Sequence, residues 1–313
     1  MRRSFACVAF ALVAASTAHA GSPRALLALD CENLTVDDVR STLADAEAPR
    51  IIALHGSVPI VDMGPFATFL EKMGYPREKL RLPGAASPSN ASFVDSRRIA
   101  GYVAWLYERE GLMPMLIGHS QGGMIVIKVL HDLASKEPIA VWDPRLPAPE
   151  ARTTIADPFT GEPRDVTSLK VHYAAALATG SLPRVLLGQW GMLPLLRDVP
   201  DSVVDFTGFA IPYDPIAGTG REPTPFRATG TASVRNVVLP ATTSHIGMPR
   251  VAHLADARAT RAWIEAYRPG TSVPLPAEAD TANLLHAADI WYDVKRHWCL
   301  GAQRIAQRRN ALR

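Results

Sequence analysis

Residues 115–130 read MLIGHSQGGMIVIKVL, and this stretch decides the fold. The apolar run up to residue 117 predicts a short buried strand, and the residues from 122 onward are typical of a helix. Between them, residues 118–122 read GHSQG and have the spacing G-x-S-x-G. A sharp turn from strand to helix exposes the serine hydroxyl, and its crowded backbone requires glycine on both sides. We therefore interpret Ser120 as a candidate nucleophile in an elbow formed with Gly118 and Gly122.

The alternation of strand and helix continues on both sides of this elbow. Short apolar runs predict further strands at residues 50–54, 138–142, 203–211 and 234–239. Apolar residues keep helical spacing at residues 66–73 and 95–110, each followed by glycine, and again at residues 254–267. This order favours an α/β fold with a mostly parallel central sheet and helices on both faces.

Two regions fit the alternation less well. Residues 143–200 are rich in proline and weak in periodicity, and we expect an insertion over the carboxyl edge of the sheet, either a lid or an ordinary run of loops and peripheral helices. Residues 271–313 are expected to form a C-terminal helical extension. Its end, residues 295–313, has six Lys or Arg and no acid. Such a patch can contact an anionic membrane surface, although it is more typical of a solvated tail.

The motif GHSQGG resembles the nucleophile elbow of bacterial lipases and esterases, and in element order residues 50–267 resemble the α/β-hydrolase superfamily. The resemblance implies a serine hydrolase whose catalytic residues follow the chain order serine, acid, histidine. It also implies that the insertion at residues 143–200 precedes the loop that carries the acid.

The histidine should lie on a loop after the last strand, because the base must reach the serine hydroxyl. His245 fits, since it follows the strand predicted at residues 234–239 and precedes a helix. His253 is the alternative, although it lies within or beside that helix.

The acid is assigned to Asp214 in the stretch IPYDPI, which follows the strand predicted at residues 203–211 and resembles the acid loop of the superfamily. Asp143 and Asp205 are alternatives, the first at the end of an earlier strand and the second inside a strand. An aspartate before proline is also common in ordinary turns.

Two N–H donors are needed to stabilise a tetrahedral oxyanion. The backbone of Gln121, directly after the nucleophile, is expected to supply one. The stretch LHGS at residues 54–57 resembles the oxyanion loop of lipases and assigns the second donor to the backbone of Ser57. His55 is then expected to brace this loop.

The first 20 residues, MRRSFACVAFALVAASTAHA, have the layout of a signal peptide that is cut after Ala20. Residues 21–313 would then form the mature domain in the periplasm or the extracellular medium. Cys31 and Cys299 remain after cleavage, and in an oxidising compartment such a pair predicts a disulfide, the alternative being two buried thiols.

The chain carries 33 basic and 30 acidic residues, which gives no indication of a nucleic-acid partner. No zinc or dinucleotide motif occurs in the sequence, so we expect neither metal nor cofactor. The expected activity is hydrolysis of carboxylic esters, on small-molecule or lipid substrates. Acyl transfer, thioester cleavage and a catalytically silent binding protein are the alternatives, and the oligomeric state is left open.

Overall fold

The structure is a computed structural model that describes residues 23–57, 61–271, 274–275 and 281–311. The expected signal peptide therefore lies outside the described residues. Within them, no helix is long and apolar enough to span a membrane.

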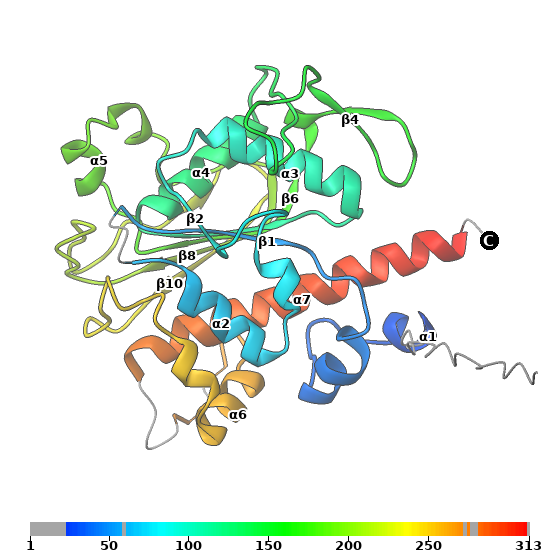
Figure 1. Ribbon diagram of the computed structural model, residues 1–313. Coiled ribbons are helices and arrows are strands. Elements are labelled where there is room, and N and C mark those ends of the chain that lie inside the picture. Colours follow the sequence, from blue (N-terminus) through cyan, green and yellow to red (C-terminus); the bar gives the residue numbers. More distant parts are fainter. Residues whose placement is uncertain (1–22, 58–60, 272–273, 276–280, 312–313) are drawn as a thin grey trace, which may run out of the picture.

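A six-stranded sheet forms the centre of the molecule (Figure 1). Its strands have the order β10-β8-β6-β3-β1-β2, and every neighbouring pair is parallel. All their carboxyl ends consequently meet at one edge of the sheet. The strand bounds are β1 Ile51–Leu54, β2 Ser89–Asn90, β3 Met115–His119, β6 Val171–Leu177, β8 Val203–Ala210 and β10 Ser233–Val238.

Helices cover both faces of this sheet, as the alternation in the sequence predicts (Figure 1). Along β1, Ile51 and Ala53 belong to one buried cluster and Ile52 and Leu54 to the other, because successive side chains of a strand point to opposite faces. The first cluster includes residues of α2 (Gly64–Met73), α6 (Arg258–Ala266) and α7 (Thr281–Ala311), and the second includes residues of α3 (Ser96–Glu110) and α4 (Gln121–Leu133).

The remaining elements are short. A separate hairpin and a two-stranded pair lie outside the central sheet. The bounds are α1 Pro23–Leu27, α5 Leu182–Leu186, β4 Thr154–Ala156, β5 Pro163–Asp165, β7 Asp198–Val199, β9 Arg227–Ala228, and the 3₁₀ or π turns η1 Asp38–Leu43, η2 Arg77–Leu80, η3 Val166–Ser168, η4 Trp190–Met192 and η5 Ala252–Ala255.

The expectation that residues 143–200 form an insertion is wrong for its central part. Strand β6 lies inside this region and pairs with β3 on one side and β8 on the other. Its sequence VHYAAAL is rich in alanine, which has low strand propensity, so composition did not mark it as a strand. Conversely, residues 138–142 form no strand, because their backbone pairs locally with residues 150–152 and not with the sheet.

Helix α7 is a central part of the fold and not a peripheral extension. It has 31 residues and runs along one face of the sheet (Figure 1). Trp291 and Trp298 of this helix are among the largest fully buried side chains of the protein. The sequence therefore predicts the helix correctly but not its position in the core.

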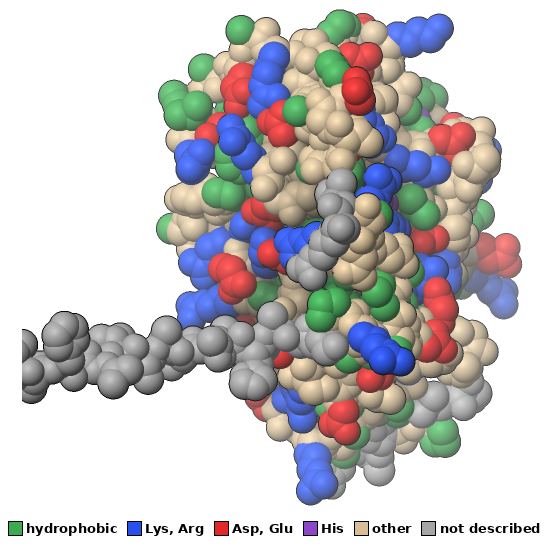
Figure 2. Space-filling view, turned by 90° about the vertical axis from the view of Figure 1, so that its right-hand side faces the viewer, with side chains coloured by type: hydrophobic (Ala, Val, Ile, Leu, Met, Phe, Trp, Pro, Cys, Tyr) green, Lys and Arg blue, Asp and Glu red, His purple; other side chains and the backbone are tan. Residues whose placement is uncertain are grey.

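Basic residues of α7 from position 295 onward contact other parts of the protein. Lys295 is buried and donates to the carbonyl oxygen of Glu265, while Arg296 pairs with Glu32 and Asp205. Figure 2 shows acidic and basic side chains intermixed on the side of the molecule where α7 ends. A continuous positive patch is not visible on that face.

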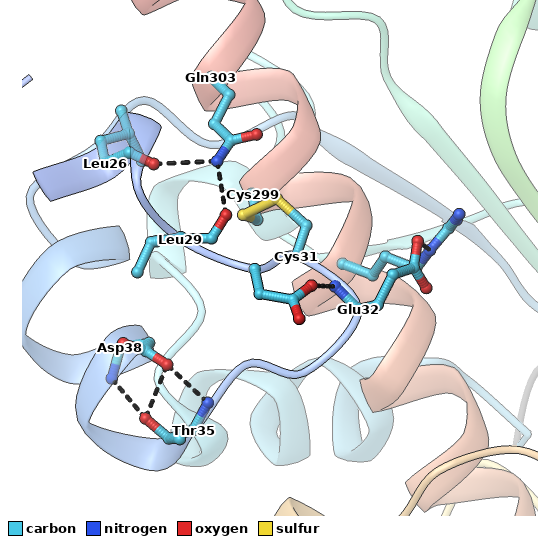
Figure 3. The surroundings of a disulfide bond; sticks show 10 residues. Leu26, Leu29, Cys31, Glu32, Thr35, Asp38, Cys299 and Gln303 are labelled. Atoms are coloured by element: carbon cyan, nitrogen blue, oxygen red, sulfur yellow. Dashed lines mark hydrogen bonds and ion pairs between the residues drawn. A yellow bond between two sulfur atoms is a disulfide. The ribbon is translucent and has the colours of Figure 1, made fainter. Parts of the chain in front are cut away.

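Cys31 and Cys299 form a disulfide with a Cα–Cα distance of 5.5 Å (Figure 3). It links the segment after α1 to the middle of α7. Next to it, the Gln303 side-chain amide donates to the carbonyl oxygens of Leu26 and Leu29, at 3.0 and 2.9 Å. The two ends of the described chain are thus held together by a covalent bond and by hydrogen bonds.

Candidate active site

Ser120 lies at the carboxyl end of β3, in the sharp turn that leads into α4. Its backbone has φ 53° and ψ −112°, a conformation that a residue with a side chain rarely adopts. A Cβ on Gly118 would overlap the backbone of Gly122, and a Cβ on Gly122 would overlap the carbonyl oxygen of Leu54. Glycine is therefore required on both sides of the serine, as the G-x-S-x-G spacing predicts.

The backbone of this turn is fixed by the neighbouring strand β6. The Ser120 amide donates to the carbonyl oxygen of Leu177 at 2.7 Å, and the Ser120 carbonyl accepts from the Thr179 hydroxyl at 3.1 Å. Two hydrogen bonds from one neighbouring segment hold the strained conformation in place. The position of the serine hydroxyl is thereby set by the sheet itself.

Asp214 and His245 lie together at the same edge of the sheet, on the loops that follow β8 and β10. His245 Nδ1 and Asp214 Oδ2 are 2.5 Å apart, and both side chains are buried. The second carboxylate oxygen of Asp214 accepts the backbone N–H groups of Ile216 and Ala217 at 2.9 and 3.1 Å. The carboxylate therefore has a partner on each oxygen.

Electrostatics keep this carboxylate ionised. Burial alone would raise the pKa of Asp214, but the hydrogen bond and charge of His245, with the two backbone N–H donors, outweigh it and hold the pKa below its usual value. An ionised Asp214 accepts the Nδ1–H of His245. The other ring nitrogen, Nε2, is then the one left to accept a proton.

His119 packs against His245 from inside the elbow. Its Nε2 lies 2.8 Å from the carbonyl oxygen of His245, and the ring centroids are 5.0 Å apart. Burial and the nearby His245 lower the pKa of His119 to about 3. The ring is thus neutral at physiological pH, and its Nε2–H supports the backbone of the loop that carries His245.

The predicted oxyanion residues lie on both sides of Ser120. Gln121 is the first residue of α4, where backbone N–H groups have no partner within the helix. A Cβ on Gly56 would lie 3.4 Å from the Cβ of Ser120, so the loop that contains Ser57 approaches the serine directly. His55 Nδ1 is 2.6 Å from the carbonyl oxygen of Gly56, which fits a bracing role.

The alternative acids make other contacts. Asp143 pairs with Arg145 at 2.6 Å, and Asp205 pairs with Arg296 and His297 at 2.9 and 3.1 Å. The structure does not bring either of them to His245.

The alternative base, His253, lies in η5 and is exposed. It is His245, and not His253, that contacts Asp214. Among the described residues, no group of three His, Cys, Asp or Glu side chains lies close enough to hold a metal ion.

Three residues near the site were not expected from the sequence: His119, Thr179 and Arg184. His119 occupies a variable position of the G-x-S-x-G motif, which carries no expectation for it. Thr179 follows β6, and once that strand is recognised its position at the carboxyl edge is a usable signal. Arg184 lies in the proline-rich region, and nothing in its local sequence indicates that its side chain is buried.

No family model, curated protein or solved structure matches this chain. The interpretation of the site therefore rests on the residues and on their geometry.

Proposed function

We propose that the protein is a serine hydrolase that cleaves carboxylic esters through Ser120, His245 and Asp214. The observation that carries the proposal is the 2.5 Å contact between His245 and Asp214 at the sheet edge where the strained elbow presents Ser120. A serine hydroxyl needs such an oriented base before it can act as a nucleophile at neutral pH.

The reaction follows from these positions. Nε2 of His245 takes the proton of the Ser120 hydroxyl while its oxygen attacks the ester carbonyl carbon. The backbone N–H groups of Gln121 and Ser57 stabilise the oxyanion, and the loss of one such donor costs about 3 kcal/mol. His245 then gives the proton to the departing alcohol as the ester C–O bond breaks. Water repeats both steps on the acyl-enzyme and releases the acid.

Exposed apolar side chains around the site support a substrate with an apolar portion. Leu186, Trp190 and Tyr213 are 75%, 60% and 63% exposed. The first two lie on the segment between β6 and β7, and Tyr213 directly precedes Asp214. Monomeric proteins rarely expose large apolar patches, so an exposed apolar area of this kind is typical of a binding surface.

The disulfide between Cys31 and Cys299 supports an exported protein, because such bonds persist mainly in oxidising compartments. We propose the periplasm or the extracellular medium as its location.

The test is intact mass spectrometry after treatment with a fluorophosphonate. One adduct is expected on the wild type, none on Ser120→Ala, and a rate lower by on the order of 10³-fold on His245→Ala. Thermal unfolding of each variant checks that it is folded.

A folded wild type that forms no adduct, in buffer and in non-ionic detergent, would reject hydrolysis and favour a binding protein. Product analysis with an added alcohol, and with thioesters, then separates hydrolysis from acyl transfer and thioester cleavage.

A further inference from the structure

The segment between β6 and β7, residues 181–197, has an inverted polarity. Its apolar side chains Leu182, Val185, Leu186, Leu187, Trp190 and Leu195 are exposed, whereas Arg184 is 1% exposed. A short helix usually turns its apolar side chains inward and its charges to water. The burial of the Arg184 guanidinium group therefore requires an explanation.

The hydrogen bonds of Arg184 use only one end of its guanidinium group. Nη1 donates to the side-chain oxygens of Gln121 and Gln189, the latter at 2.6 Å. Nε is buried and has no acceptor. Within the described part of the chain, Nη2 has no acceptor either. The edge formed by Nε and Nη2 is the one that arginine uses to bind a carboxylate with two parallel hydrogen bonds.

No acidic side chain of the described residues compensates this charge. Other arginines differ: the buried Arg50 pairs with Glu110 at 2.6 Å, and the partly buried Arg235 pairs with Asp293 at 2.5 Å. The partners of Arg184 are two neutral amides. Burial lowers the pKa of Arg184 to about 10, so the group is still charged at neutral pH. An unpaired buried charge is unfavourable by several kcal/mol.

The position of Arg184 relates this charge to the reaction. Its partner Gln121 directly follows Ser120 in the chain. The start of the segment packs on the acid loop, where the Leu182 amide donates to the carbonyl oxygen of Ala217 at 3.4 Å. The guanidinium group therefore lies beside the nucleophile elbow, on a segment whose start contacts the loop of Asp214. A substrate that extends from Ser120 along this segment would approach it.

We propose that Arg184 binds a carboxylate group of the substrate, so that the preferred esters are half-esters of dicarboxylic acids. The two unused donors match the two oxygens of a planar carboxylate. The segment buries few side chains besides Arg184, Met192 and Leu196, so it can open locally at small cost to admit the ester. This inference rests on the proposed function, because it assigns the substrate of the same site.

The experiment compares monoethyl glutarate with diethyl glutarate in a pH-stat. The two esters share an acyl skeleton, and the monoester has a carboxylate where the diester has a second, neutral ethyl ester. The wild type should show a higher kcat/KM for the monoester by roughly 10- to 100-fold, the range of a charge-assisted bidentate contact. In Arg184→Gln the ratio of the two kcat/KM values should fall to about 1, mainly through the monoester. Arg184→Lys keeps the charge but cannot form the two parallel hydrogen bonds, and it should give an intermediate ratio.

Arg197→Gln is the matched control. Arg197 belongs to the same segment and contacts no acid, but it donates to the carbonyl oxygen of Thr179 at 2.8 Å and stacks on Phe226. Its replacement removes the same charge and should leave the ratio unchanged. Because both esters are measured on one preparation, partial unfolding of a variant changes both rates and not their ratio.

Two results would overturn the inference: no preference of the wild type for the monoester, or a preference that survives in Arg184→Gln. A preference that survives while both esters lose the same factor would mean that Arg184 acts on the oxyanion and not on the substrate carboxylate. Hydrolysis of diethyl glutarate that is lost in Ser120→Ala shows that the proposed function holds in each of these cases. No hydrolysis of either ester, with no fluorophosphonate adduct, would instead reject the proposed function itself.

Discussion

The His119 imidazole packs edge-on against His245 and donates its Nε2–H to the His245 carbonyl oxygen at 2.8 Å. The residue that precedes the proposed nucleophile thus supports the backbone of the residue that is proposed to activate it. The elbow and the histidine loop are therefore one structural unit, although 126 positions separate the two histidines in the chain.

This buried histidine predicts a pH-dependent stability. The pKa of His119 is about 3 in the folded state, against 6.5 when it is exposed, so the unfolded chain binds an additional proton between these values. The contribution of neutral His119 to the free energy of unfolding is complete above pH 6.5 and decreases as the pH falls toward 3. For His119 alone, the free energy of unfolding should be lower by about 2 kcal/mol at pH 5 than at pH 7.

Urea unfolding of the wild type and of His119→Gln at both pH values measures this contribution. The variant, which lacks the titrating group, should show a smaller difference between the two pH values. An identical difference in both proteins would contradict the pKa shift.

Replacement of Asp214 by Asn should remove most of the activity and leave the protein folded. The amide would favour the wrong tautomer of His245, so kcat should fall by about 10⁴-fold. Asp205→Asn is the control, because that carboxylate pairs with Arg296 and His297 outside the site. It should lower the unfolding temperature and leave kcat within a few-fold. Equal losses of kcat in the two variants would speak against Asp214 as the acid.

A methyl group at Gly122 should destabilise the elbow. The Cβ of Gly122→Ala would overlap the carbonyl oxygen of Leu54, a rigid backbone atom at the carboxyl end of β1. Overpacking of this kind costs about 1–3 kcal/mol or more, and it should also lower the rate of fluorophosphonate labelling.

The matched variant is Gly191→Ala, where no atom lies within 4 Å of the added Cβ. Chemical unfolding should show no loss of stability for this variant. If both variants were equally stable, the close approach at Gly122 would not be a constraint on the elbow.

Removal of the Cys31–Cys299 disulfide should destabilise the protein by about 2–5 kcal/mol. The double variant Cys31→Ser/Cys299→Ser and the reduced wild type should unfold at the same lower temperature in calorimetry. A reductant should have no further effect on the double variant. A wild type whose unfolding temperature does not respond to reductant would show that the bond contributes little.

The features that the sequence predicts well depend on local spacing. The elbow glycines, the helix ends at Gly74 and Gly111, and the single pairing of two cysteines follow from short-range sterics or from counting. Asp214 and His245 lie side by side, and this contact is accessible to sequence reasoning because parallel strands bring their carboxyl ends to one edge.

The features that the sequence does not predict depend on tertiary packing. Strand β6 has a composition that favours a helix, and only its place between β3 and β8 makes it extended. Arg184 is a second example. Its charge predicts a position on the surface, but the fold buries its side chain against Gln121. Long-range contacts override local preference in both cases.

Helix α7 has a consequence for the order in which the protein can fold. Trp291 and Trp298 complete the hydrophobic layer beneath the sheet, and the bridge joins positions 268 residues apart. During synthesis from the N-terminus, this layer, to which α2 and α6 also contribute, is therefore completed only when nearly the whole chain has left the ribosome. The native core is therefore expected to close only after the last helix has been synthesised.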